Sequence, residues 1–109
     1  MAMPQVNSGP ETYSPIDLPD IDNGRRVPLG IMISRVRLWR RWSQNEVALK
    51  ADMRPQTISE IELGKRMPKS VPKIMKLADA LEMPREQLFK WIVNEFEYQD
   101  ARSAKRREQ

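Results

Sequence analysis

The sequence predicts an all-α fold. Between residues 28 and 101, apolar residues recur with a helical period, and Pro, Gly and capping residues mark where the successive segments begin and end. The chain has 109 residues and no Cys, so helix packing rather than disulfides must hold it together. These observations indicate one small helical domain flanked by tails.

The N-terminal segment, residues 1–26, is predicted to be a disordered tail. It contains Pro4, Pro10, Pro15 and Pro19 and shows no helical period. Residues 1–24 also carry four acids and no base. Residues 13–22 alternate apolar and acidic side chains, a pattern that also suits a peptide that docks on a partner or masks a surface of the same chain.

Two helices are predicted next. The first begins near Pro28 and runs to about Arg41. The second begins at Ser43, because Ser43 and Glu46 have the spacing of a capping box, in which each side chain bonds the main chain of the other residue. A narrow apolar stripe lets another helix approach this second helix closely: Val47, Ala48 and Ala51.

A third helix is predicted from Pro55 to Leu63 and a fourth from about Val71 to Leu81. The third has a proline at its first position and ends at Gly64, which can adopt the left-handed conformation. It turns Ile58 and Ile61 inward and leaves polar side chains outside. In the fourth helix the apolar residues keep a clean helical period.

A specific pattern over about forty positions runs through the second, third and fourth helices. Its members are Ser43, Gln44, Glu46, Ala48, Thr57, Ile58, Ser59, Ile61, Glu62, Gly64, Lys65, Pro68, Leu77, Ala78, Ala80 and Leu81. With these residues, the segment from Leu29 to Phe89 resembles the phage-repressor and Cro type of helix-turn-helix, also called the xenobiotic-response-element (XRE) type. The resemblance implies a compact lambda-repressor-like bundle of about five helices, with a DNA-binding domain at residues 27–84. Such domains bind double-stranded DNA, usually as dimers on a two-fold operator.

Three positions depart from the family pattern. Asp52 stands at the hinge where this family usually has Gly, and Glu82 stands at the equivalent turn after the fourth helix. Both side chains would have to accommodate a left-handed backbone, for which Asp is better suited than Glu. At the start of the third helix, Arg54 and Pro55 replace the usual Ser or Thr cap and supply no capping oxygen.

The resemblance assigns DNA-binding roles by position. Ser43 and Gln44, at the start of the second helix, would meet a phosphate. Lys65 and Arg66, in the loop after the third helix, would contact the DNA backbone without specifying sequence. The residues that would face base edges are Arg54, Pro55, Gln56, Ser59 and Glu60. Among these, Gln56 suits adenine and Glu60 can accept from cytosine N4.

The resemblance also implies a structural ion pair. Arg37 in the first helix and Glu62 in the third occupy positions that the family pairs. These two residues are therefore expected to link the helices rather than to contact DNA.

The net charge of +4 conceals a segregation of charge along the chain. Residues 25–76 carry thirteen bases and four acids, whereas residues 77–101 carry two bases and six acids. Residues 102–109 are expected to form a short basic tail. Positive charge is concentrated in the stretch that contains the helix-turn-helix, where it attracts phosphate and makes binding salt-dependent.

Residues 85–101 are predicted to form an extended C-terminal helix beyond the usual end of the family domain. One interpretation is that this helix caps the core of the monomer. Its apolar stripe is, however, broader than one side of a small bundle covers, which favours dimerisation or docking of a protein partner. The residues expected in that contact are Leu88, Phe89, Ile92 and Phe96.

Composition excludes several classes of protein. Without Cys or His, the chain lacks the usual nucleophile, general base and zinc ligands, so no enzyme, metal or cofactor is expected. No apolar run approaches the roughly 20 residues that span a bilayer. The N-terminus lacks the features of a signal peptide. A cytoplasmic protein without a membrane partner is therefore expected.

The expected function is sequence-specific, DNA-binding transcriptional regulation. The chain would act as a repressor that binds a palindromic operator as a homodimer. The alternative is an antitoxin that binds its own operator, while its N-terminal tail or C-terminal helix neutralises a toxin partner. A third hypothesis is an adaptor that kept the fold without binding DNA, and the basic patch argues against it.

Overall fold

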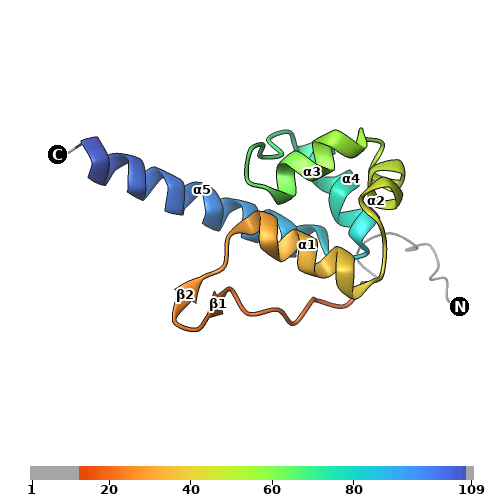
Figure 1. The fold of residues 1–109 in the computed structure, drawn as a ribbon, viewed down its shortest axis with the longest axis horizontal. Coiled ribbons are helices and arrows are strands. Elements are labelled where there is room, and N and C mark those ends of the chain that lie inside the picture. Colours follow the sequence, from red (N-terminus) through yellow and green to blue (C-terminus); the bar gives the residue numbers. More distant parts are fainter. Residues whose placement is uncertain (1–12, 108–109) are drawn as a thin grey trace, which may run out of the picture.

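The part of the chain that the structure describes folds into five helices and one short hairpin (Figure 1). The computed structural model describes residues 13–107 of the chain. The elements are β1 (Ile21–Asp22), β2 (Arg25–Arg26), α1 (Leu29–Trp39), α2 (Gln44–Ala51), α3 (Pro55–Glu62), α4 (Val71–Leu81) and α5 (Arg85–Arg107). The all-α bundle of about five helices that the sequence predicts is therefore confirmed. Within residues 13–107, no helix is both long enough and apolar enough to cross a lipid bilayer.

The helices enclose one apolar core. Helix α2 packs against α3 and α4, α1 packs against α3 and α5, and α5 also packs against α4. Beyond this contact α5 continues past the bundle as a projecting rod (Figure 1). The largest fully buried side chains are Ile33, Val36, Val47, Ile58, Leu77, Leu81, Met83 and Leu88.

The helix ends follow the local signals in the sequence. Ser43 Oγ accepts a hydrogen bond from the Glu46 amide at 3.0 Å, and Glu46 Oε1 accepts one from the Ser43 amide at 2.7 Å, which completes the predicted capping box. Ser70 Oγ accepts from the Lys73 amide at 3.2 Å and so caps α4. As predicted, α3 begins with Pro55 and receives no side-chain cap.

The turns at Asp52 and Glu82 adopt the left-handed conformation without glycine, as does Arg41 after α1 with φ 63°. Asp52 ends α2 with φ 57° and ψ 47°, and Glu82 ends α4 with φ 57° and ψ 50°. In both turns the following amide reaches back to the helix: Met53 N donates to Ala48 O at 2.9 Å, and Met83 N donates to Ala78 O at 3.0 Å. Asp52 and Glu82, two of the three departures from the family pattern, therefore share one turn geometry, at the steric cost of a side chain in this conformation.

A close approach of α1 to α3 depends on Gly30, which the sequence did not single out. A Cβ atom at this position would lie 2.3 Å from Glu62 O and 2.6 Å from Ile61 O. Main-chain atoms cannot yield as a flexible side chain can. The missing side chain therefore sets how closely α1 lies on the C-terminal end of α3.

The expectation of a disordered tail is wrong for residues 13–26, which pack against the bundle. Ile16 and Leu18 lie against the core. The Gln87 side chain holds the main chain of Ile16 with two hydrogen bonds, from Ile16 N to Oε1 at 2.8 Å and from Nε2 to Ile16 O at 2.7 Å. Apolar burial and satisfied main-chain groups offset the entropy of ordering this segment. Residues 1–12 of the expected tail lie outside the described residues.

A β-hairpin lies between this segment and α1. Strands β1 and β2 pair antiparallel, and Asn23 and Gly24 form the turn with φ 53° and φ 75°. An Asn-Gly pair is the preferred sequence for a two-residue turn in which both central residues have positive φ. The turn signal was present in the sequence, but its two-residue strands are too short to show a β pattern.

The Glu95 carboxylate joins the hairpin, α1 and α5. Glu95 is 8% exposed and accepts hydrogen bonds from Arg26 of the hairpin, from the Leu29 amide at 3.1 Å and from Gln99 Nε2 at 3.0 Å. No neighbouring side chain caps the start of α1, so the Glu95 carboxylate, which is distant in sequence, acts as the cap by accepting the hydrogen bond from the Leu29 amide. Burial alone would raise the pKa of Glu95, but the bonds from Arg26, Leu29 and Gln99 outweigh it and lower that pKa.

The C-terminal helix differs from the expectation in two respects. It continues to Arg107, so most of the expected basic tail is helical. Leu88 and Ile92 are 0% and 2% exposed and belong to the monomer's core, whereas Phe89 and Phe96 are exposed. The apolar stripe of α5 is therefore divided between two faces, and half of the residues expected in a dimer contact serve the core instead.

Candidate nucleic-acid interface

Helices α2 and α3 form the helix-turn-helix, connected by the short turn from Asp52 to Arg54. Ile58 and Ile61 anchor α3 in the core, at 1% and 2% exposure. The opposite side of α3 is polar and open to solvent. Of the residues expected to face base edges, Arg54, Pro55 and Gln56 are exposed, and Ser59 and Glu60 are half-buried.

An ion pair fixes α3 against α1. Arg37 Nε donates to Glu62 Oε2 at 2.6 Å, and Arg37 Nη2 donates to Glu62 Oε1 at 3.0 Å. Arg37 Nη1 also donates to the Trp42 carbonyl at 2.9 Å. The side chains of Arg37 and Glu62 are 12% and 7% exposed, so the pair that the resemblance implies is present and largely buried.

The start of α2 is tied to the same ion pair. Gln44 Nε2 donates to Glu62 Oε1 at 2.9 Å, which directs this side chain toward α3. Ser43 uses its hydroxyl in the capping box. The groups at the start of α2 that remain for an anion are therefore main-chain amides, toward which the helix dipole attracts negative charge.

Three candidate DNA-binding residues contact one another on α3 and the loop that follows. Arg66 Nε donates to Glu60 Oε1 at 2.8 Å, and Gln56 Nε2 donates to Glu60 Oε2 at 3.2 Å. Glu60 is thus the shared partner of Gln56 and Arg66, and the three residues form the Glu60 cluster. The hydrogen bond from Arg66 lowers the pKa of Glu60, so the carboxylate is charged at neutral pH.

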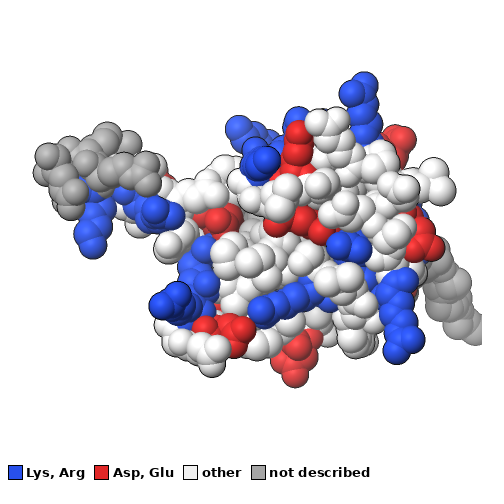
Figure 2. Space-filling model, viewed as in Figure 1, with Lys and Arg blue, Asp and Glu red and all other residues white. Residues whose placement is uncertain are grey.

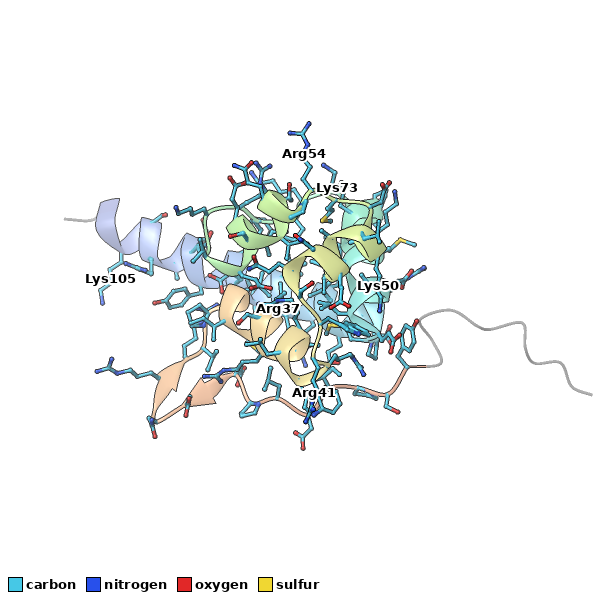
Figure 3. The ribbon with its side chains drawn as sticks, turned by 45° about the vertical axis from the view of Figure 1, so that its right-hand side comes forward. Arg37, Arg41, Lys50, Arg54, Lys73 and Lys105 are labelled. Atoms are coloured by element: carbon cyan, nitrogen blue, oxygen red, sulfur yellow. The ribbon has the colours of Figure 1, made fainter. Side chains whose placement is uncertain are left out.

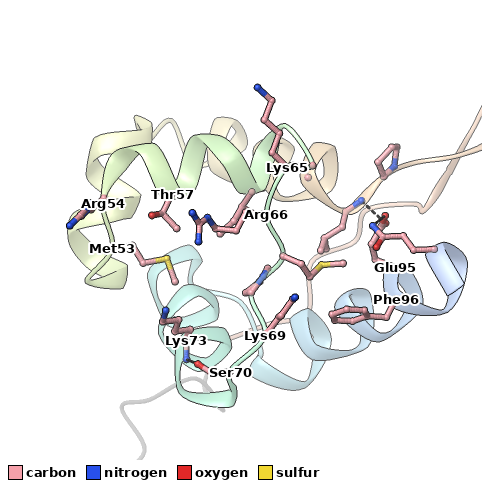
Figure 4. A pocket seen from close by; sticks show the side chains of 18 of the residues that line it. Met53, Arg54, Thr57, Lys65, Arg66, Lys69, Ser70, Lys73, Glu95 and Phe96 are labelled. Carbon is pink, nitrogen blue, oxygen red and sulfur yellow. Dashed lines mark hydrogen bonds between the residues drawn. The ribbon is translucent and has the colours of Figure 1, made fainter. Parts of the chain in front are cut away.

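A hollow of about 1000 Å³ opens beside α3, between the loop after α3, the start of α4 and one side of α5 (Figure 4). Five cations line it: Arg54, Lys65, Arg66, Lys69 and Lys73. The sequence analysis assigned the first three to DNA contacts and did not identify Lys69 and Lys73. Lys69 and Lys73 flank Ser70, the residue that caps the start of α4. A helix N-terminus attracts anions, so two lysines beside a capping serine could have indicated a phosphate contact from the sequence alone. Phe96 of α5 lies at the far end of the hollow (Figure 4).

Positive charge is not confined to this side of the molecule. Figure 2 shows Lys and Arg side chains along the edge that carries α3, and others over the hairpin and the opposite edge. In Figure 3, Arg54 and Lys73 point outward on the α3 side, whereas Arg41 lies at the opposite edge. What distinguishes the α3 side is the combination of cations with an exposed polar helix.

Comparisons with known proteins agree with this geometry. The helix-turn-helix family HTH_3 matches residues 33–88, which is half of the chain. Among solved structures, the restriction-modification controller protein C.AhdI from Aeromonas hydrophila is similar, with 27% identity and a TM-score of 0.51 over 55% of this chain and 89% of that chain. No curated protein gave a significant match.

Two structures of the controller protein C.Esp1396I are similar in fold. The wild-type protein has 22% identity and a TM-score of 0.50 over 62% of this chain and 88% of that chain. C.Esp1396I bound to a 19 base pair DNA duplex has the same identity and TM-score, over 62% of this chain and 89% of that chain. The family match extends from α1 to the start of α5 and so includes α2 and α3. The chain therefore belongs to the XRE-type helix-turn-helix family and is a DNA-binding transcriptional regulator.

Proposed function

We propose that this chain is a transcriptional repressor that binds a palindromic operator as a homodimer, with α3 in the major groove. The observation that carries the proposal is the exposed polar side of α3, bordered by cations from the turn before it, the loop after it and the start of α4. A helix with such a border can lie in the groove while the cations contact phosphates on either side.

Each residue of this interface has a proposed part. Arg54, Pro55, Gln56 and Ser59 face base edges, and Gln56 presents the donor and acceptor that match adenine. The start of α2 at Ser43 and Gln44, together with Lys65, contacts the DNA backbone. Lys69 and Lys73 extend the backbone contact along the hollow, because they line the same wall as Lys65.

The relatives support a regulator that acts on DNA. C.AhdI, at 27% identity, is a controller protein of a restriction-modification system. C.Esp1396I shares the fold and has been seen bound to a DNA duplex. The antitoxin hypothesis gains no support from these comparisons.

The exposed half of the α5 stripe is proposed to form the dimer contact. Phe89, Val93 and Phe96 are 47%, 37% and 41% exposed, and their spacing places them on one face of the helix. Three large apolar side chains in a row on a solvent-facing helix are typical of an interface. Leu88 and Ile92 take no part in this contact, because they are buried in the monomer.

Selection of bound sequences from random duplex DNA tests the function directly. A two-fold symmetric sequence is expected, because a symmetric dimer binds two half-sites about one helical turn apart. Absence of any enriched sequence would contradict the proposal.

Light scattering at micromolar concentration tests the dimer contact. A dimer is expected for the wild-type protein and a monomer for Phe96→Glu. The matched control is Glu97→Lys, which changes charge at the neighbouring exposed position. A monomeric wild-type protein that still binds a symmetric sequence would show that DNA, rather than α5, pairs the copies.

A further inference from the structure

Both oxygens of the Glu60 carboxylate already have partners in this chain. Arg66 holds Oε1 and Gln56 holds Oε2. These two bonds hold the carboxylate between Arg66 and Gln56, so its direction is set by this chain before DNA binds. A part within the Glu60 cluster makes use of both bonds, whereas the base contact expected from the sequence makes use of neither.

The main chain anchors Arg66 to the same residue. After α3 the chain turns through Gly64, which has φ 79°, and folds back on the helix. Two amides of this loop then donate to the Glu60 carbonyl, Lys65 N at 2.8 Å and Arg66 N at 3.3 Å. Arg66 is thus attached to Glu60 through its backbone and again through its side chain, so its direction is fixed before DNA arrives.

The anchored guanidinium keeps one edge for a ligand. Its Nε–H group is used by Glu60, and the side chain remains 55% exposed. The terminal nitrogens, Nη1 and Nη2, offer parallel N–H groups that match O6 and N7 of guanine. They would also fit a phosphate, but the neighbouring Glu60 carboxylate repels phosphate and weakens that contact.

We propose that Glu60 is a positioning residue that holds Arg66 and Gln56 as one unit on α3, and that Arg66, rather than Glu60, reads a guanine. Gln56 then addresses the neighbouring base pair, because it lies one turn before Glu60 on the same helix. The inference rests on the proposed function, in which α3 enters the major groove. It replaces both the cytosine contact of Glu60 and the backbone contact of Arg66 that the sequence suggested.

Glu60 also discriminates by its charge. A carboxylate in the groove disfavours every sequence through phosphate repulsion, and only the sequence that engages Arg66 and Gln56 compensates for it. Removing Glu60 should therefore raise affinity for arbitrary DNA while lowering the preference for the selected sequence.

A double-mutant cycle tests the coupling between Glu60 and Arg66. Binding is measured for the wild type, Glu60→Ala, Arg66→Ala and the double variant, on the duplex selected from random DNA and on a scrambled duplex. Arg66→Ala should reduce the preference for the selected duplex roughly 5- to 150-fold, the range for one good bidentate base contact. Glu60→Ala should lose most of the same preference, and the double variant should lose clearly less than the sum of the two single losses, because both variants remove the Arg66 contact.

Two further variants separate positioning from a general effect of charge. Glu60→Gln keeps an oxygen for Arg66 Nε and should retain more of the preference than Glu60→Ala. Lys65→Ala removes the neighbouring loop cation, and it should weaken both duplexes alike and lower the salt slope by about one. Lys65 and Arg66 are exposed and Glu60 is half-buried, so a thermal melt of each variant is used to check that it is folded.

The outcomes distinguish this inference from the proposed function. Additive losses for Glu60→Ala and Arg66→Ala would overturn it, since uncoupled residues act separately. An Arg66→Ala variant that behaves like Lys65→Ala would overturn it as well, because Arg66 would then be a phosphate contact. A wild-type protein that selects no sequence would overturn the proposed function and the inference together.

Discussion

Replacing Glu62 with alanine should destabilise the bundle by about 3–5 kcal/mol, the usual cost of removing one partner of a buried ion pair. The Glu62 carboxylate accepts two hydrogen bonds from Arg37 and one from Gln44. Bonds to a charged group are worth about 1.5–3 kcal/mol each. In the variant, Arg37 keeps its hydrogen bond to the Trp42 carbonyl, and water can hydrate part of its guanidinium. The loss of stability should therefore be smaller than the sum of the three broken bonds.

Thermal unfolding followed by circular dichroism measures this effect. For a domain of this size each kcal/mol shifts the melting temperature by roughly 4–8 °C, so the loss should exceed about 10 °C. Glu97→Ala is the matched control, because Glu97 is an exposed glutamate on α5 and its removal should change stability by less than about 0.5 kcal/mol. An unchanged melting temperature for Glu62→Ala, together with an altered DNA preference, would refute the structural role.

Three further changes test features of the fold. Gly30→Ala should lower the melting temperature by an amount equivalent to about 1–3 kcal/mol, because its Cβ would meet the carbonyl of Glu62 at 2.3 Å; an unaffected melt would mean that α1 can move away from α3. Glu82→Gly should raise the melting temperature by relieving a left-handed side-chain conformation, and a lower value would show that the side chain contributes more than the turn costs. The lowered pKa of Glu95 means that its contribution to stability is present above the unfolded pKa, near 4.5, and is lost as pH falls through the folded value. Urea unfolding of Glu95→Gln should therefore depend less steeply on pH below about 4.5 than that of the wild type, and parallel profiles would exclude this role.

The parts of the fold that follow from local chemistry could be predicted. The capping box of Ser43 and Glu46, the proline at the start of α3 and the glycine after it involve residues close together in sequence. Their geometry is set by the main chain of a single turn. The inward residues Ile58 and Ile61 follow from helical period alone.

The parts that depend on distant residues could not be predicted. Nothing near Ile16 indicates that Gln87 will hold it, and nothing near Arg26 indicates Glu95 as its partner. The apolar stripe on α5 could not be divided into buried and exposed residues from the sequence either, because Leu88 and Phe89 are both large and apolar. Only packing against the bundle buries the first and leaves the second exposed. Within the candidate interface, the sequence identified Glu60 and Arg66 individually but not their contact with each other.

The position of Glu95 has a consequence for how the chain folds. The first amide of α1 is satisfied by a carboxylate that lies 66 residues later in the sequence. During synthesis α1 is made before α5, so the start of α1 stays without its partner until Glu95 has been made. This delay disfavours early, independent folding of α1. Leu29 and Glu95 meet only when a long loop closes, so formation of the start of α1 is coupled to docking of α5 in one cooperative step.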